Sequence, residues 1–87
     1  METGYVFLNI DPGKKRECIK ALRAIEGVKE AKLVIGTFDT VAKIEGANLE
    51  QLETIYLNQI DKLSGVTNSR FHIVASRKHE TERAAQR

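Results

Sequence analysis

The residue types that perform catalysis or bind metals are scarce in this sequence. His72 is a candidate general acid or base, because an imidazole titrates near neutral pH, but no feature of the sequence supplies a second catalytic group. Cys18, the single cysteine, lies on the apolar side of an expected helix, where a thiol is more often a small buried hydrophobe than a nucleophile. With His79 as the other histidine, no ligand set has zinc-site spacing. We expect no catalytic residue, no metal site and no cofactor.

A second group of polar residues lies between apolar runs. Residues 36–39 read Gly-Thr-Phe-Asp, and Thr67 and Ser69 lead into the last apolar run. From spacing alone, the simplest interpretation is structural: Asp39 hydrogen-bonds its own turn, and Gly36 supplies a permissive backbone. A binding role for these residues needs support from elsewhere in the sequence.

The composition limits the protein classes that fit. The chain has 87 residues, 41% hydrophobic and 30% charged, which fits one compact domain. No stretch approaches the roughly 20 apolar residues of a membrane span, and the first residues do not resemble a signal peptide. We therefore expect a cytoplasmic protein that does not associate with membranes. The net charge of +2 is too small to favour nucleic acid, so we expect no direct DNA binding.

Hydrophobic periodicity predicts strands that alternate with helices. The expected strands span residues 5–10, 31–35, 40–45 and 69–75. The first helix begins at Asp11, which can cap the backbone donors that follow it, with Pro12 at the first helical position. The second begins at Asn48, and Gln51 completes the pattern of a capping box.

Two related segments indicate a duplicated plan. Gly27 and Gly65 end the expected helices, are each followed by valine, and lie 38 positions apart (65 minus 27) in similar aliphatic patterns. Each copy has a strand before its helix and a strand after it. This order, βαββαβ, predicts an α+β ferredoxin-like fold, with a four-stranded antiparallel sheet and two helices on one face.

Alternation along the strands assigns side chains to the two faces of this sheet. The set expected to face the helices is Val6, Leu8, Ile10, Ala31, Leu33, Ile35, Ala42, Ile44, Phe71 and Ile73. The other face mixes apolar and charged residues, and no segment is expected to cover it. Soluble monomers rarely expose such a patch, so we expect a second copy to pack face to face on it. The expected dimer interface contains Tyr5, Phe7, Val34, Val41, His72 and Val74.

Two other uses of the open face remain as alternatives. His72 beside Phe7 would suit a small dimeric ferredoxin-like enzyme. Aromatic residues on this face would also suit stacking with RNA bases, although residues 70–74 lack the glycine-aromatic signature of such proteins. Residues 79–87 form a charged C-terminal tail without an apolar stripe, which we expect to be solvated.

Several short motifs follow one another along residues 1–78. They are Pro12-Gly13, Gly27-Val28, the turn 36–39, Gly65-Val66, Thr67 and Ser69. In this order and spacing, the chain resembles the effector-binding (RAM) domain of the Lrp/AsnC transcription regulators. Full-length members carry an N-terminal helix-turn-helix domain. This sequence begins four residues before its first expected strand, so the resemblance implies a stand-alone version without that domain.

The resemblance implies sheet-mediated dimers, larger rings, and small amino acids bound between dimers. A free amino acid needs partners for both its carboxylate and its ammonium. Backbone N–H groups at Gly36 and Thr37 would hold the carboxylate, the Asp39 carboxylate would pair with the ammonium, and Thr67 and Ser69 would add hydroxyls from a neighbouring loop. We therefore expect a non-enzymatic amino-acid-sensing and oligomerisation module that modulates full-length Lrp/AsnC regulators. The sequence does not specify the amino acid or the size of the oligomer.

Overall fold

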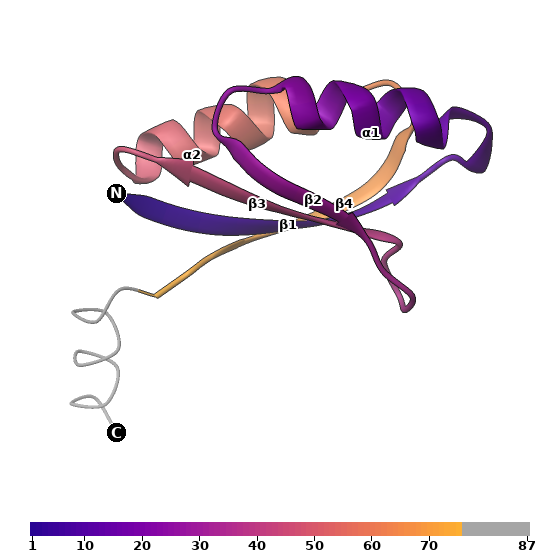
Figure 1. The fold of residues 1–87 in the computed structure, drawn as a ribbon. Helices are drawn as coiled ribbons and strands as arrows, with labels where there is room; N and C mark the ends of the chain where they lie inside the picture. The colour runs from indigo at the N-terminus through magenta and orange to yellow at the C-terminus, as the bar shows by residue number, and fades with distance from the viewer. Residues whose placement is uncertain (76–87) are drawn as a thin grey trace.

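Two helical segments cover one face of a four-stranded antiparallel sheet in the computed structural model, which describes residues 1–75 (Figure 1). The elements in chain order are β1 (Glu2–Ile10), a 3₁₀ turn (Pro12–Lys14), α1 (Lys15–Ala24), β2 (Val28–Leu33), β3 (Thr40–Gly46), α2 (Leu49–Ile55) with a π-helical continuation (Tyr56–Ile60), and β4 (Val66–Ile73). The strand order is β2-β3-β1-β4. This confirms the predicted α+β ferredoxin-like βαββαβ fold. The tail at 79–87 and the boundary before it lie outside the described residues.

The helices begin as their sequence signals predict. Asp11 Oδ1 accepts a hydrogen bond from the Gly13 N–H at 2.9 Å. At α2, Asn48 Oδ1 accepts from the Gln51 N–H at 2.8 Å, and the Gln51 side chain accepts in return from the Ala47 N–H. These bonds satisfy backbone donors that the first helical turn leaves without partners, so they fix where each helical segment starts.

The two repeated glycines have the same conformation. Gly27 has φ +98° and Gly65 has φ +102°, in the left-handed region that a side chain disfavours. Strands β2 and β4 begin at the next residues, Val28 and Val66. The strands therefore start earlier than the predicted positions 31 and 69, because each left-handed glycine turns the chain so that it enters the sheet at the next residue.

The core lies between the helices and the sheet. Its buried residues are Val6, Leu8, Ile10, Cys18, Ile19, Leu22, Ala31, Ala42, Ile44, Leu52, Ile55 and Ile60. Phe71 also faces this layer, where its ring stacks on Tyr56 with 4.9 Å between centroids. Leu33 and Ile73 lie on the predicted side of the sheet, in register with Thr40 and Gly4, but contrary to expectation they are exposed; the prediction was wrong for Ile35. Leu33 and Ile73 end the two edge strands, where each has a neighbour on one side only, and Ile35 lies beyond the end of β2 and is fully exposed.

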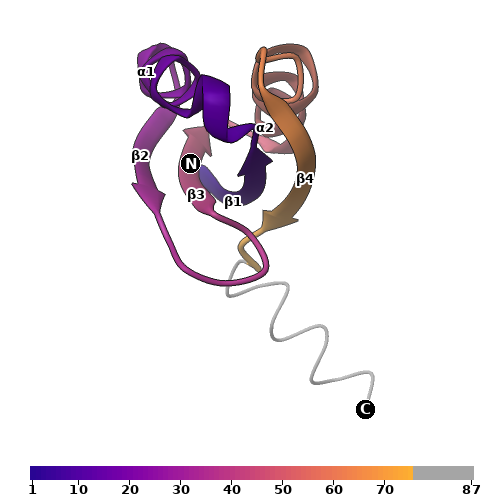
Figure 2. The same ribbon diagram turned by 90° about the vertical axis from the view of Figure 1, so that its right-hand side faces the viewer.

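The face opposite the helices is partly covered, contrary to expectation. The loop of residues 34–39 joins β2 to β3 and bends beneath this open face (Figure 2). The Phe38 ring lies 5.9 Å from that of Phe7. This happens because β2 ends at Leu33, two residues before the predicted end, which lengthens the loop. Within residues 1–75, no helix is long and apolar enough to span a membrane.

Candidate functional site

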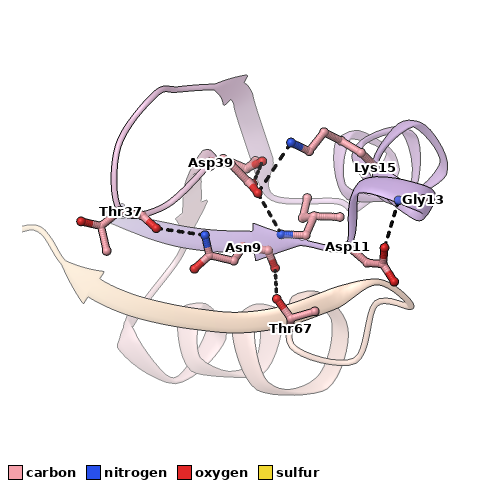
Figure 3. A network of polar contacts seen from close by, with 9 residues as sticks. Asn9, Asp11, Gly13, Lys15, Thr37, Asp39 and Thr67 are labelled. Atoms are coloured by element: carbon pink, nitrogen blue, oxygen red, sulfur yellow. Dashed lines mark hydrogen bonds and ion pairs between the residues drawn. The ribbon is translucent and has the colours of Figure 1, made fainter.

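Asn9 links the loop of residues 34–39 to two strands. Its Nδ2 donates to the Thr37 carbonyl at 3.0 Å, and its own carbonyl accepts from the Thr67 hydroxyl at 3.2 Å (Figure 3). Asn9 lies on the same face of β1 as Tyr5 and Phe7, and the sequence predicted no role for it. The available signal was an amide side chain within an otherwise apolar strand, because such a group usually has hydrogen-bond partners when it is partly buried.

Asp39 fastens the other end of the loop. Its Oδ2 accepts from the Ile10 N–H at 3.2 Å and lies 3.6 Å from Lys15 Nζ, and its Oδ1 accepts from the Thr40 hydroxyl at 2.8 Å (Figure 3). The Asp39 N–H also donates to the Leu8 carbonyl at 3.1 Å. The carboxylate thus joins β1, β3 and α1. Its side chain is 29% exposed and keeps lone pairs for a further cation.

The tip of the loop offers free backbone donors. Gly36 and Thr37 are exposed, and within the described residues neither N–H group donates a hydrogen bond. A Cβ built on Gly36 would have as its nearest neighbour the Phe38 carbonyl oxygen at 4.0 Å, so the approach to this backbone is open. Exposed N–H groups with no side chain in front of them can bind a carboxylate.

Thr67 and Ser69 belong to strand β4 and not to a loop, which corrects the expectation. A register irregularity between Asn9 and Ile10 separates the environments of the two hydroxyls. Thr67 joins the network around Asn9. Ser69 pairs with Leu8 on the helix side, where its Oγ lies 2.6 Å from Tyr56 Oη and donates to Asp61 Oδ1 at 2.8 Å. Four of the five predicted effector-binding residues therefore surround β1 at the loop, and Ser69 has partners elsewhere.

The predicted interface residues lie mostly on the open face. Tyr5 and Phe7 of β1, Val41 of β3 and His72 of β4 share it through the strand register. Phe7 meets the His72 ring edge-on at 5.6 Å. Two of the predicted interface residues lie outside the strands, namely Val34 and Val74, which are 40% and 42% exposed. Val34 was predicted to lie in a strand, but it is part of the loop.

Ion pairs accompany the apolar residues of this face. Lys32 Nζ lies 2.7 Å from Glu30 Oε1, and Lys43 Nζ lies 3.9 Å from Glu45 Oε2. The hydrogen bond from Lys32 and its charge lower the pKa of Glu30 below its usual value. The first pair is exposed and the second is partly exposed, so neither contributes much to the stability of the fold.

Neither catalytic candidate has the surroundings of an active site. His72 is exposed, and its aromatic neighbour is Phe7. No group of three or more His, Cys, Asp or Glu residues with the geometry of a metal site occurs in the part of the chain that the structure describes. Cys18 is 2% exposed in the core, and burial, with a smaller effect of the Asp39 charge, raises the pKa of its thiol.

Cys18 is therefore predicted to resist alkylation. Iodoacetamide reacts with the thiolate, and in the native chain both burial and the raised pKa keep that form scarce. We expect modification of the folded chain at pH 8 to be at least about a hundredfold slower than in 6 M guanidinium chloride, because it requires local opening. Intact-mass spectrometry over time measures both rates. Equal rates in the two conditions would contradict the buried position.

Comparisons with known proteins show which family the chain is similar to. The family model described as "Lrp/AsnC ligand binding domain" matches residues 3–84. An uncharacterized HTH-type transcriptional regulator of Pyrococcus horikoshii is 28% identical over 67 residues, which are 74% of this chain and 45% of that protein. The chain thus spans about half the length of the curated relatives it matches.

Solved structures share the fold over most of the chain. The crystal structure of FFRP-DM1 has a TM-score of 0.80 and 30% identity, and the match covers 85% of this chain and 99% of that one. The complex of the Neisseria meningitidis transcriptional regulator NMB0573 with L-Met has a TM-score of 0.78 at 12% identity, covering 87% of this chain and 51% of that one. The family model covers nearly the whole described region, which confirms the resemblance seen in the sequence. The chain belongs to the Lrp/AsnC ligand-binding domain family, whose members are non-enzymatic effector-binding domains linked to transcription regulation.

Proposed function

We propose that this chain is an amino-acid-responsive oligomerisation module that modulates full-length Lrp/AsnC regulators. The observation that carries the proposal is the loop of residues 34–39, which exposes free N–H groups at Gly36 and Thr37 and, at its end, carries the anchored carboxylate of Asp39, in a chain of the ligand-binding family. A donor pair and a carboxylate match the two charged ends of a free amino acid.

The loop is suited to a ligand that a second subunit completes. Gly36 and Thr37 are exposed, so an amino acid held by one chain would keep part of its surface in water. Burial against a neighbouring copy would strengthen its charged hydrogen bonds. Thr67 reaches the same region through Asn9. Ser69 enters the proposed site only if its bonds to Tyr56 and Asp61 are exchanged. The complex of the Neisseria meningitidis regulator with L-Met supports a small amino acid as the ligand class.

The open sheet face is the proposed dimer interface. It combines the half-exposed rings of Tyr5 and Phe7 with Val41 and a border of charged side chains. An apolar centre with a polar rim is the usual anatomy of a protein interface, and a two-fold axis lets one face cover itself. Ligand binding would then regulate a partner by favouring one assembly over another, in proportion to its difference in affinity for the two.

Calorimetric titration of the assembled protein with the twenty amino acids tests the proposed site. We expect at least one to bind, and Asp39→Ala to weaken that binding at least about tenfold, because a charge-assisted hydrogen bond is lost. Asp39→Asn keeps the shape of the side chain and removes its charge, so it should also bind weakly. Glu26→Ala, an exposed carboxylate outside the loop, is the control and should bind as the wild type does. Absence of binding by every amino acid would overturn the sensor proposal.

A further inference from the structure

A basic groove runs along the outer side of α1. The cavity beside this helix has a volume of about 670 Å³ and is lined by Lys15, Arg16, Lys20 and Arg23, with Leu33 among its apolar residues. No acidic residue lines it. Leu33 is 59% exposed there, although it is a large apolar side chain. The groove therefore combines an uncovered apolar surface with four positive charges.

Most of this charge is not neutralised within the chain. Lys15 approaches Asp39 at 3.6 Å, and Arg23 Nη2 donates to the Ala31 carbonyl at 2.8 Å, which holds that side chain against β2. Arg16 and Lys20 form no ion pair with another residue among 1–75. A partner that brings carboxylates and an apolar side chain would satisfy both properties of the groove.

The outer face of α2 has the complementary character. Leu49, Glu53 and Leu57 follow one another at intervals of four, and Glu50 lies one turn before Glu53. The two leucines are 37% and 51% exposed. Both glutamates are exposed and form no ion pair with another described residue. Residues three and four apart share one side of a helix, so α2 and the start of its π-helical continuation, which holds Leu57, present two carboxylates between two exposed leucines.

We propose that the α1 groove of one copy binds the α2 face of another copy. The charges are opposite, and each surface adds exposed leucine to the contact. Helix α1 lies above β2 at one edge of the sheet, whereas α2 lies on the side of β4, the other edge (Figure 2). The contact therefore joins two different surfaces, and such head-to-tail interfaces build closed rings or open filaments. It uses the helix layer, so it is separate from the proposed sheet dimer.

Charge exchange between the two surfaces tests the contact. One variant carries Glu50→Lys with Glu53→Lys, and the other carries Arg16→Glu with Lys20→Glu. In a solution of either variant alone, like charges face each other across the contact. The head-to-tail association should therefore weaken on the order of a hundredfold. An equal mixture of the two should recover it, because each variant then offers the surface that the other lacks. Sedimentation velocity at 0.2 mM protein, in low and in 0.5 M salt, measures the particle sizes. Wild-type assembly should shrink at high salt, since exposed charges are screened.

A control variant separates this contact from the effects of net charge and of folding. Glu17→Lys with Glu26→Lys changes the net charge by the same amount as Glu50→Lys with Glu53→Lys does. It also removes an acidic residue from the first turn of a helix, but neither residue lies on the two surfaces. It should assemble as the wild type does, and circular dichroism should show all variants folded. If the sheet dimer does not form, the differences in particle size between the variants and the wild type should remain, but all particles should be smaller. Wild-type size in the Glu50→Lys and Glu53→Lys variant, or a wild type with no particle larger than two chains, would overturn the proposal.

Discussion

Replacing Phe7 with aspartate should weaken the proposed sheet dimer by about 4 kcal/mol, or nearly a thousandfold, while each chain stays folded. Phe7 lies centrally on the open face, between the Phe38 ring at 5.9 Å and the His72 ring at 5.6 Å. In a face-to-face dimer, an aspartate at this position would be buried without a partner. In the separate chain the same position is only half-buried, so water can still reach the carboxylate.

Sedimentation equilibrium over a range of concentrations measures this effect. The wild type should be associated at micromolar concentration, and the Phe7→Asp chain should sediment as a single copy of 9.8 kDa or as the product of helix-layer contacts alone. Lys20→Glu, a charge change on the helix layer, is the control that should leave the sheet dimer intact. A wild type that sediments as one chain at these concentrations would refute the sheet dimer. Single-stranded RNA that binds the wild type and not the variant would favour the alternative use of this face.

Replacing Leu8 with alanine should lower the stability of the folded chain and leave its association through the sheet unchanged. Leu8 is 0% exposed in the core, on the face of β1 that the helices cover. Removing a buried leucine side chain costs about 3 kcal/mol, from lost burial and from the cavity that remains. For a domain of this size, the free energy of unfolding falls by about 1 kcal/mol per molar urea. The urea concentration at the midpoint of unfolding should therefore fall by roughly 3 M.

Urea unfolding in the Phe7→Asp background isolates this effect, because association would otherwise add to the apparent stability. Leu8→Met keeps the volume and should cost less than about 1.5 kcal/mol, so it remains measurable if the alanine variant does not fold. Leu57→Ala, which removes a side chain that is 51% exposed, should change the free energy of unfolding by about 0.5 kcal/mol or less. A Leu8→Ala midpoint equal to that of the control would contradict the assignment of Leu8 to the core.

The adjacent pair Phe7 and Leu8 shows why the fold was predictable from the sequence. Successive side chains in a strand point to opposite faces, so Phe7 belongs to the open face and Leu8 to the face that the helices cover. The cap residues Asp11 and Asn48 and the left-handed glycines add local signals whose chemistry depends on near neighbours only. Together these local features determined the order of elements, the two faces and most of the buried core.

The candidate site was only partly predictable, because its contacts join residues distant in sequence. The turn residues Gly36, Thr37 and Asp39 were visible as a motif, but Asn9 gained a role only when the loop bent onto β1, 28 residues away from Thr37. Lys15 meets Asp39 in the same way. The resemblance assigned Ser69 to the site together with Thr67, but a register irregularity between β1 and β4 gives the two hydroxyls different partners.

By itself, then, the sequence determined the βαββαβ order, where the helical segments start and the apolar open face, because periodicity, capping and left-handed glycines act over a few residues. The tertiary structure alone decided that β2 ends at Leu33, that the loop of residues 34–39 covers one end of the open face, and that the basic groove of α1 and the acidic face of α2 lie toward opposite edges of the sheet. These features depend on how strands pair and how helices pack across the chain, and such long-range arrangements leave no fixed spacing in the sequence.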